Sequence, residues 1–470
     1  QGCCAMLQIG QAAVGITPPL GTHLAGSGMG EHRPAQKILD PLYAKVMVAQ
    51  AKDAKLCIIT LDTLAVTLPY TRAIRESAVA LGFEPHAVMV HSLQNHSAPS
   101  CGALMLDPDF PLDLRADQEH ITGSEAAYTK QAVAGATRAI QEANDALTPV
   151  QVAMGHAVRD DLAFNRRGVM RGGNICMPWP FTSDAKPLGP TDIVYMEGPA
   201  DPQVGVWCAQ SAAGEVAAML LHFTCHPVNV FAREKNTVCA DWPGAWSAKV
   251  KDQNSLMCPP LVINGCCGNV NPWPAFTPNF TPDHVRMGNE LADTTQAVIE
   301  SLSFADVDSI DWRFKKIPLA YRDIPNDRQD QVNRILAEHP TLKLQDNGEV
   351  DPTWFHAAST KSIELCRNRE PQFMYEIQVF RIGDMAIISL PGEPFVEGQL
   401  EIKTRSPAKL TFIAHMSTQY IGYLPTRDAC ARPGHETNAH CTYWAKFAPD
   451  SLERIVEATL AILTELFEND

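Results

Sequence analysis

The chain has 470 residues, and its 38 Lys and Arg residues against 53 Asp and Glu residues give a formal net charge of −15 at pH 7. A chain this acidic is poorly suited to phosphate-backbone contacts, so nucleic acid is not an expected partner. Hydrophobic residues make up 45% and charged residues 19%, which is a globular composition and excludes a disordered chain. No apolar run reaches the roughly 18 residues of a membrane span, so we expect no transmembrane segment.

Short apolar runs alternate with longer helix-like runs along the chain. Strands are predicted, in chain order, at 45–49, 56–61, 87–91, 150–157, 204–208, 216–223, 261–264, 375–382, 385–390 and 410–414. Helices are predicted at 69–81, 124–146, 282–301, 328–338, 352–366, 394–404 and 451–467. This alternation favours an α/β fold with mixed β-sheet layers, flanking helices and long loops. Because no repeat or linker interrupts the pattern, we expect a single domain over 1–470, with 325–369 as a helical excursion.

Four apolar strands run directly into polar, turn-forming residues. The segments are AVMVHSLQNHSAPS (87–100), AMLLHFTCHPVNV (218–230), PLVINGCCGNVNPWP (260–274) and AIISLPGEPFVEG (386–398). In open α/β sheets a ligand binds beyond the carboxyl ends of the strands, so we expect these ends to meet at one pocket. With TQYIGYLPT (418–426), they carry His91, Gln94, His96, His226, Asn269, Asn271, Glu393, Tyr420 and Tyr423.

Imidazole, carboxylate and phenol groups together are typical ligands of a zinc-like ion, and an open position in such a shell holds an activated water. No HExxH or CxxC motif joins these residues locally. Spacing alone therefore leaves structural roles for the histidines open.

The same segments carry a resemblance that extends nearly from end to end. Its motifs, in chain order, are VGITPPLGTHLAGSG, LDPLYAKVMV, VMVHSLQNHSAP, FNRRGVM, GPADPQVGVW, FTCHPVN, ADWPG, NGCCGNVNP, LPGEPF and YIGYLPT. In this order they resemble the catalytic domain of the neutral/alkaline (non-lysosomal) ceramidase family. The resemblance implies that family's α/β catalytic domain and its zinc-dependent amidohydrolase chemistry. In that chemistry a zinc-bound water, or a serine beside it, attacks the amide of an N-acylsphingosine.

The resemblance implies a metal site with one altered ligand. His226, Glu393 and Tyr423 match three family zinc ligands, whereas Gln94 stands where the family has a fourth, a histidine. His96 matches the family's second histidine, which assists at the metal. A glutamine oxygen binds zinc more weakly than imidazole does. Either the site accepts Gln94, or His91 or His96 rearranges to bind the ion, or the metal is lost or changed.

The resemblance also implies an altered nucleophile position. In GNVNPW, Asn271 stands at the position of the family's proposed serine, and Asn269 at that of an aspartate. An amide cannot act as that nucleophile, so a covalent serine mechanism is excluded at this position. Asn271 is expected to orient substrate or to donate to an oxyanion. The chain ends in a predicted helix, so we expect the family's C-terminal immunoglobulin-like domain to be absent.

A short basic segment stands out in this acidic chain. Asn165, Arg166 and Arg167 follow a strand-like run, and two arginines there can hold a carboxylate or sulfate; Arg33 belongs to the same class. Surface ion pairs are the alternative explanation. His435 and Glu436 lie in a loop that could line a pocket.

These features predict a ceramidase-like metal-dependent hydrolase that acts on a small, polar, anionic substrate. One zinc ion would be held by His226, Glu393 and Tyr423, with Gln94 or His96 completing the set. His96 would act as general base, with Asn271 and Tyr423 at the reacting centre, and Asn269 with the arginine segment would bind substrate. The cleaved bond is amide, ester or glycosidic. The alternatives are a family member that binds a ligand without catalysis, or a lyase or isomerase that reuses the pocket.

Overall fold

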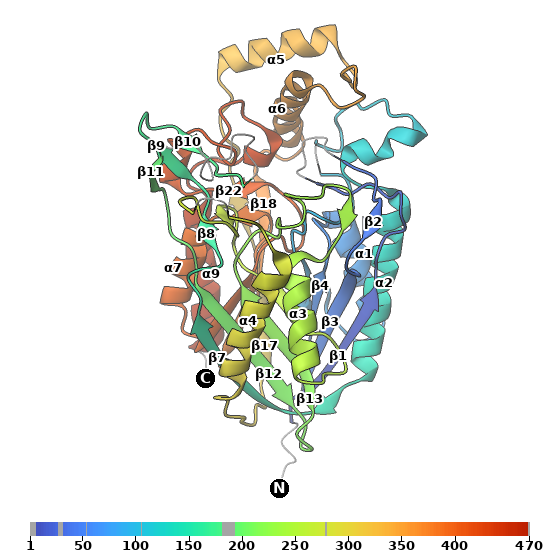
Figure 1. The fold of residues 1–470 in the computed structure, drawn as a ribbon, viewed down its shortest axis with the longest axis vertical. Helices are drawn as coiled ribbons and strands as arrows, with labels where there is room; N and C mark the ends of the chain where they lie inside the picture. Colours follow the sequence, from blue (N-terminus) through green and yellow to red (C-terminus); the bar gives the residue numbers. More distant parts are fainter. Residues whose placement is uncertain are drawn as a thin grey trace.

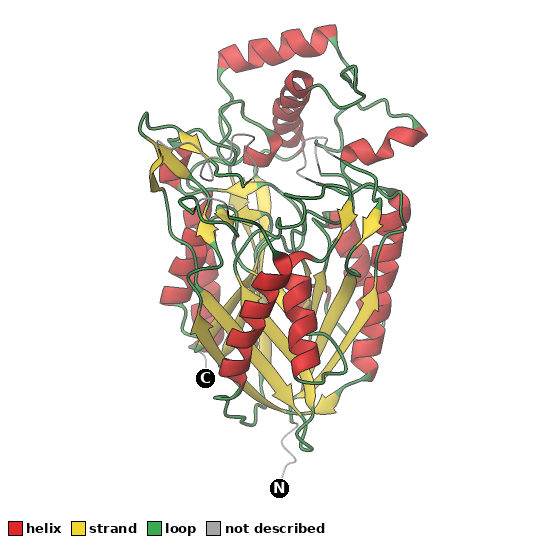
Figure 2. Cartoon of the chain, in the orientation of Figure 1, coloured by secondary structure: helices red, strands yellow, loops and turns green. Residues whose placement is uncertain are grey.

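The computed structural model describes residues 6–26, 32–52, 54–104, 106–180, 193–277 and 280–468 (Figure 1). Three main sheets form the body of the protein, and long loops gather at one end of them, below the helix pair α5 and α6 (Figures 1 and 2). No described helix is long and apolar enough to cross a membrane.

The first main sheet has the order β5-β4-β3-β1-β6. Its strands are β1 (Gln8–Gly15), β3 (Tyr43–Ala51), β4 (Ala54–Leu61), β5 (Val88–Ser92) and β6 (Thr148–Pro149). The pairs are antiparallel except β4 with β5, which is parallel. Helices α1 (Leu68–Val79) and α2 (Ala126–Asp145) pack on one face, with Ile74, Tyr128 and Ile140 buried against the sheet.

The other two main sheets repeat this plan. The second has the order β15-β13-β12-β7 and the third β17-β18-β19-β21. Their strands are β7 (Gln151–Val158), β12 (Gln203–Gln210), β13 (Val216–Phe223), β15 (Leu261–Asn264), β17 (Ile310–Leu319), β18 (Phe373–Ile382), β19 (Met385–Ser389) and β21 (Leu410–Ala414). In each, one pair is parallel: β13 with β15, and β19 with β21.

Helices cover the second and third sheets as well. Helices α3 (Asp241–Gln253) and α4 (His284–Ile299) bury Trp246 and Leu291 against the second sheet. Helices α7 (Val396–Arg405) and α9 (Ser451–Phe467) pack on the third. The remaining helices are α5 (Asn326–Glu338), α6 (Pro352–Arg369), α8 (Arg427–Cys430) and the 3-10 turns η1 (Pro85–Ala87), η2 (Ala116–Thr122) and η3 (Tyr443–Ala445).

Short strands connect the loops at the ends of the main sheets. They are β2 (Lys37–Ile38) with β14 (Thr237–Val238), β8 (Phe164–Asn165) with β16 (Val270–Asn271), β20 (Glu393–Pro394) with β22 (Tyr423–Leu424), and the three-stranded group β9 (Gly168–Met170), β10 (Ile175–Cys176) and β11 (Ile193–Met196). Several of these pairs contain residues of the predicted site.

One apolar cluster joins the three main sheets. It contains Ile58 of the first, Trp207 of the second and Phe412 of the third. Each sheet therefore has one face on this shared core and the other under helices, which removes both apolar faces from water. Segment 325–369 is tied to the body too, because Trp354 and Phe355 of α6 belong to the core cluster of the third sheet.

The predicted mixed α/β fold with flanking helices is confirmed. The ten predicted strands and seven predicted helices are all present. Strands 216–223, 261–264 and 410–414 and helix 451–467 have the predicted bounds, and the ends of the others are shifted. Strands β1 and β17 and helix α3 were not among the predicted elements. Charged and amide side chains interrupt the two strands, and α3 begins with Asp-Trp-Pro-Gly, a sequence typical of a turn.

A close approach between β1 and α2 gives a test of the packing of the first sheet. A Cβ atom on Gly10 would lie 2.0 Å from the backbone oxygen of Ala143, which cannot move without shifting the helix. We expect Gly10→Ala to lower the free energy of unfolding by about 1–3 kcal/mol, as overpacking does. Gly15→Ala, on the same strand with nothing within 4 Å, is the matched control. Urea denaturation of both variants measures the difference, and equal stabilities would contradict this packing.

Candidate functional site

The ends of the parallel strands meet, as the sequence predicts. After β5, the carbonyl of Leu93 accepts a hydrogen bond from Asn264 Nδ2 at 3.0 Å, and the same nitrogen lies 3.0 Å from the carbonyl of Cys225. After β21, the backbone N–H of His415 donates to the carbonyl of Asn264 at 3.2 Å. Asn264 therefore links segments from all three main sheets at one point.

Two short strand pairs set the site residues beside one another. Glu393 of β20 and Tyr423 of β22 are register partners. Asn271 of β16 pairs with Phe164 of β8, two residues before Arg166. All four polar residues are buried, with 3% of Glu393 and 5% of Arg166 exposed.

The guanidinium of Arg166 lies at the centre of the polar cluster. Its Nη2 donates to the Tyr423 hydroxyl at 3.1 Å, and its Nη1 lies 3.3 Å from Asn271 Oδ1 and 3.4 Å from His226 Nε2. Its Nε donates to Glu436 Oε1 at 2.7 Å. One side chain thus brings together three sequence-predicted site residues and one carboxylate from the loop before α9.

Glu436 supplies the negative charge that balances the arginine pair. Its Oε2 accepts from Arg167 Nη1 at 2.8 Å, while Oε1 accepts from Arg166. Burial by itself would raise the pKa of this carboxyl, but Arg166 and Arg167 outweigh burial and lower the pKa to about 2. Glu436 is therefore ionised inside the core.

His226 presents one unprotonated ring nitrogen to the cluster. Its Nδ1 lies 3.0 Å from the carbonyl of Val270, which accepts a hydrogen bond and fixes the proton on Nδ1. Burial, followed by the charge of Arg166, holds the pKa of His226 well below its usual range, so the ring is neutral. The unprotonated Nε2 atom lies 3.4 Å from Glu393 Oε2. This is the arrangement of a metal-binding histidine.

Gln94 lies between Glu393 and His415. Its backbone has a φ of 63°, in the left-handed region, and its side-chain Nε2 donates to Glu393 Oε2 while Oε1 lies 2.7 Å from His415 Nε2. His415 Nδ1 donates to the carbonyl of Asn264, so in the neutral ring Nε2 carries a lone pair. Two acceptors then face each other, and a turned Gln94 amide would donate to His415 Nε2, which the Cys267 thiol also reaches at 3.4 Å.

The orientation of the Gln94 amide decides whether its oxygen or its nitrogen faces Glu393, and so whether Gln94 can bind a metal there. The turned amide places the Gln94 oxygen against the Glu393 carboxyl, and a proton or a cation must then lie between the two oxygens. Burial raises the pKa of Glu393, which favours the proton when no cation is bound. With His226 Nε2 and the Tyr423 hydroxyl, these oxygens form a donor set that fits zinc. Arg166 donates to His226 and Tyr423, so the guanidinium and an ion would use the same lone pairs.

His96 lies beside this donor set rather than in it. Its ring centroid is 5.7 Å from that of His226 and 5.6 Å from that of Phe231, and neither ring nitrogen has a hydrogen-bond partner among the described residues. Burial and the neighbouring His226 lower its pKa to about 3. His96 is thus a neutral, unpaired imidazole at the edge of the cluster. His91, the other histidine considered for the metal, is held at both ring nitrogens by backbone groups of His415 and Asn264.

Several residues predicted to bind substrate have structural contacts instead. Asn165 bonds the backbone of Arg167 and Pro199, and Asn269 bonds Glu397 and the backbone of Val396. Each amide bonds once through its oxygen and once through its nitrogen to other parts of the protein.

The other two arginines of that prediction are also used within the protein. Arg167 is paired with Glu197 and Glu436, and Arg33 with Glu349 in the segment between α5 and α6. Of these arginines, Arg166 contacts His226, Asn271 and Tyr423, whereas Arg167 reaches the cluster only through Glu436.

The thiol and carboxylate neighbours have structural roles. Cys267 lies 3.4 Å from both Gln94 Oε1 and His415 Nε2, but burial raises its pKa far above the usual value, so it is a thiol and not a nucleophilic thiolate. The Asp241 carboxylate accepts hydrogen bonds from Asn229 Nδ2 and from the backbone N–H groups of Val230 and Trp242.

Sequence reasoning did not assign two residues of the site. His415 follows β21 in the same strand-to-polar pattern as the four chosen segments, and that pattern could have found it. Glu436 was predicted only to lie in a loop that could line a pocket, with no contact assigned to it. Its pairing with Arg166 spans 270 positions, and no local signal predicts such a contact.

The chain has a neutral-ceramidase-like fold. A neutral ceramidase structure from Pseudomonas aeruginosa matches it with a TM-score of 0.71 over 99% of this chain and 75% of that chain, at 15% sequence identity. A structure described as ceramidase complexed with C2 matches with a TM-score of 0.70, over 99% of this chain and 76% of that one, also at 15% identity. No protein-family model matches the sequence, and no curated protein sequence does. The predicted resemblance is therefore confirmed at the level of the fold.

The buried pair of Arg166 and Glu436 predicts a pH-dependent stability difference. Glu436→Gln leaves the buried Arg166 guanidinium without its carboxylate and Arg167 with Glu197 alone, so we expect the free energy of unfolding to fall by about 3–5 kcal/mol at pH 7. Because the folded-state pKa is depressed to about 2 from the ordinary 4.5, the contribution of Glu436 is complete above pH 4.5 and disappears toward pH 2. The stability gap between the two proteins therefore narrows as the pH falls through this range.

Glu457→Gln is the control, since Glu457 forms an exposed ion pair with Arg405 at the surface. We expect little change from it at any pH. Denaturant titrations at several pH values measure the three proteins, and a gap that stays constant from pH 7 to pH 2 would contradict the buried pair.

Proposed function

We propose that this protein is a hydrolase that cleaves a carbonyl-type bond in a small, polar, anionic substrate, using one divalent metal ion, zinc by preference. The observation that carries the proposal is the convergence of His226 Nε2, Glu393 and the Tyr423 hydroxyl around one buried point, next to Arg166. The neutral-ceramidase-like fold supports a hydrolytic activity. The ion would be held by these three residues and by the oxygen of Gln94.

Each residue of the site has a chemical task in this proposal. A bound zinc ion supplies a Lewis acid and lowers the pKa of a water to about 7. Arg166 and Asn271 carry hydrogen-bonding groups that favour negative charge or orient a carbonyl, because they lie in a buried site of low dielectric. No serine stands at Asn271, so the proposed reaction is a direct attack by water.

His96 is the proposed acceptor of the proton that the water loses. Its two unpaired nitrogens leave it free to do so. A pKa of about 3 is low for a general base, whose pKa works best near the operating pH. The base therefore depends on negative charge, from the substrate and the reacting oxygen, to hold the imidazolium once it forms.

A binding protein without turnover is the second candidate, and one observation favours it. Arg166 is hydrogen-bonded to both His226 and Tyr423, and such contacts fill the donor set with the protein's own cation. In that case Arg166 would hold an anionic ligand and no bond would be broken.

Hydrolysis assays separate the two candidates. We expect turnover of N-acyl or ester substrates that carry a carboxylate, and weaker turnover of the same compounds with that carboxylate converted to a carboxamide. His226→Ala should lower kcat/KM by more than about 100-fold, since even groups that only support a metal ligand contribute about 10–100-fold. His156→Ala, on β7 at a distance in the second sheet, is the control. Ligand binding without turnover across the series would favour the binding protein.

Gln94 gives a second prediction, on metal affinity. Imidazole binds zinc more strongly than an amide oxygen does, so Gln94→His should tighten zinc binding measured by competition with a chromophoric chelator. Gln419→His, at a neighbouring loop position away from the donor set, serves as the control. Unchanged affinity in Gln94→His, with both variants folded, would place Gln94 outside the ligand set.

A further inference from the structure

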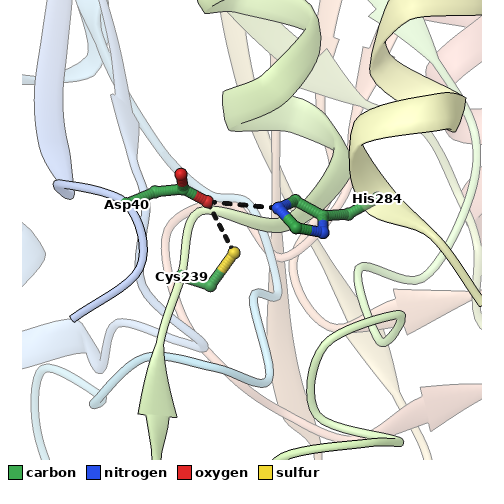
Figure 3. A group of neighbouring side chains, drawn as sticks. All are labelled: Asp40, Cys239 and His284. Carbon is green, nitrogen blue, oxygen red and sulfur yellow. Dashed lines mark hydrogen bonds and ion pairs between the residues drawn. The ribbon is translucent and has the colours of Figure 1, made fainter. Parts of the chain in front are cut away.

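A second group of metal-binding side chains lies apart from the proposed catalytic site. Asp40 follows β2, Cys239 follows β14, and His284 is the first residue of α4. The parallel pairing of β2 with β14 sets Asp40 and Cys239 side by side. Figure 3 shows the three side chains pointing toward one another.

The distances within this group are short enough for a shared ion. Asp40 Oδ2 lies 2.7 Å from Cys239 Sγ and 3.4 Å from His284 Nε2. The three donor atoms all lie within 4.8 Å of one another, and no other group of three His, Cys, Asp or Glu residues in the described part of the chain meets that criterion.

The surroundings of the sulfur suit a metal-bound thiolate. The backbone N–H of Asp241 donates to Cys239 Sγ at 3.2 Å, a contact that stabilises negative charge on sulfur. The thiol itself is fully buried, while 35% of the Asp40 side chain is exposed. The group therefore combines a protected sulfur with one side open to water.

We propose that Asp40, Cys239 and His284 form a second metal site, for zinc or a similar borderline-soft divalent ion. Thiolate, imidazole and carboxylate are the zinc ligands of proteins, and a water at the exposed side would complete four-coordination. Binding forms a metal–sulfur bond and releases the thiol proton to solvent. This site shares no ligand with the proposed catalytic site and does not depend on the proposed function.

Contacts of the same segment indicate what this site does. The Cys239 N–H donates to the carbonyl of Ser97 at 3.2 Å, and its carbonyl accepts from Asn95 Nδ2 at 2.7 Å. The adjacent Asp241 carboxylate accepts from the N–H of Val230 at 2.9 Å. An ion at Cys239 would thus fasten the two loops that carry His96 and His226, which gives the site a structural role.

Cobalt spectroscopy tests the proposal, because Co²⁺ substitutes for Zn²⁺ and a cobalt–thiolate bond has a near-ultraviolet charge-transfer band. We expect the band in the wild-type protein after removal of bound metal and addition of Co²⁺. Cys239→Ser should abolish it, and Asp40→Asn, at a partly exposed position, should weaken Co²⁺ binding. Cys258→Ser, which removes a partly exposed cysteine elsewhere, should leave the band unchanged.

Two further variants separate this site from the catalytic one. The band should persist in His226→Ala and in Cys267→Ser, whose thiol is the one beside Gln94. Absence of a band from the wild-type protein, persistence in folded Cys239→Ser, or loss in Cys267→Ser would each overturn the second site. In His226→Ala we expect hydrolysis to be lost and the cobalt band to remain. The activity assay therefore tests the proposed function, and the cobalt band tests the second metal site.

Discussion

The buried ion pair of Arg166 and Glu436 is the interaction on which the site depends. A guanidinium is stable in an apolar core only when a carboxylate and further acceptors surround it. Glu436 supplies the charge, and Asn271, Tyr423 and His226 supply the acceptors. The same contacts hold the loop before α9 against the strand ends of the second and third sheets. Assembly of the polar cluster and closure of the loops over it are therefore one event.

The position of Arg166 affects both the charge at the site and how well the site could bind a metal ion. Arg166 donates to two of the atoms that the proposed ion would use, and the family resemblance implies that Gln94 stands in place of an imidazole. In the proposed site, both features would weaken metal binding relative to a ligand set that included a second histidine. In the proposed site, the Arg166 guanidinium, whose charge Glu436 balances, would also donate hydrogen bonds to an anionic substrate. We therefore propose that, within this ceramidase-like fold, the site trades metal affinity for anion affinity.

The sequence predicted the layers of the fold and most of the residues at the centre of the site, because both depend on local signals. Apolar runs gave the strands, and their polar ends gave His226, Asn271 and Glu393. Sequence did not predict the contacts that depend on residues far apart in the chain. Arg166 and Arg167 are adjacent and identical in residue type, so sequence does not distinguish them. In the structure Arg166 bonds to the site residues, whereas Arg167 also bonds to Glu197 and to the backbone carbonyls of Ala429 and Arg432.

X-ray diffraction at the zinc absorption edge, on crystals grown with zinc, tests the central claim most directly. The account predicts an anomalous peak about 2.0–2.2 Å from His226 Nε2 and from a Glu393 oxygen, with Arg166 no longer bonded to His226. A map without a peak at this position, in which Arg166 still donates to His226 and Tyr423, would contradict it.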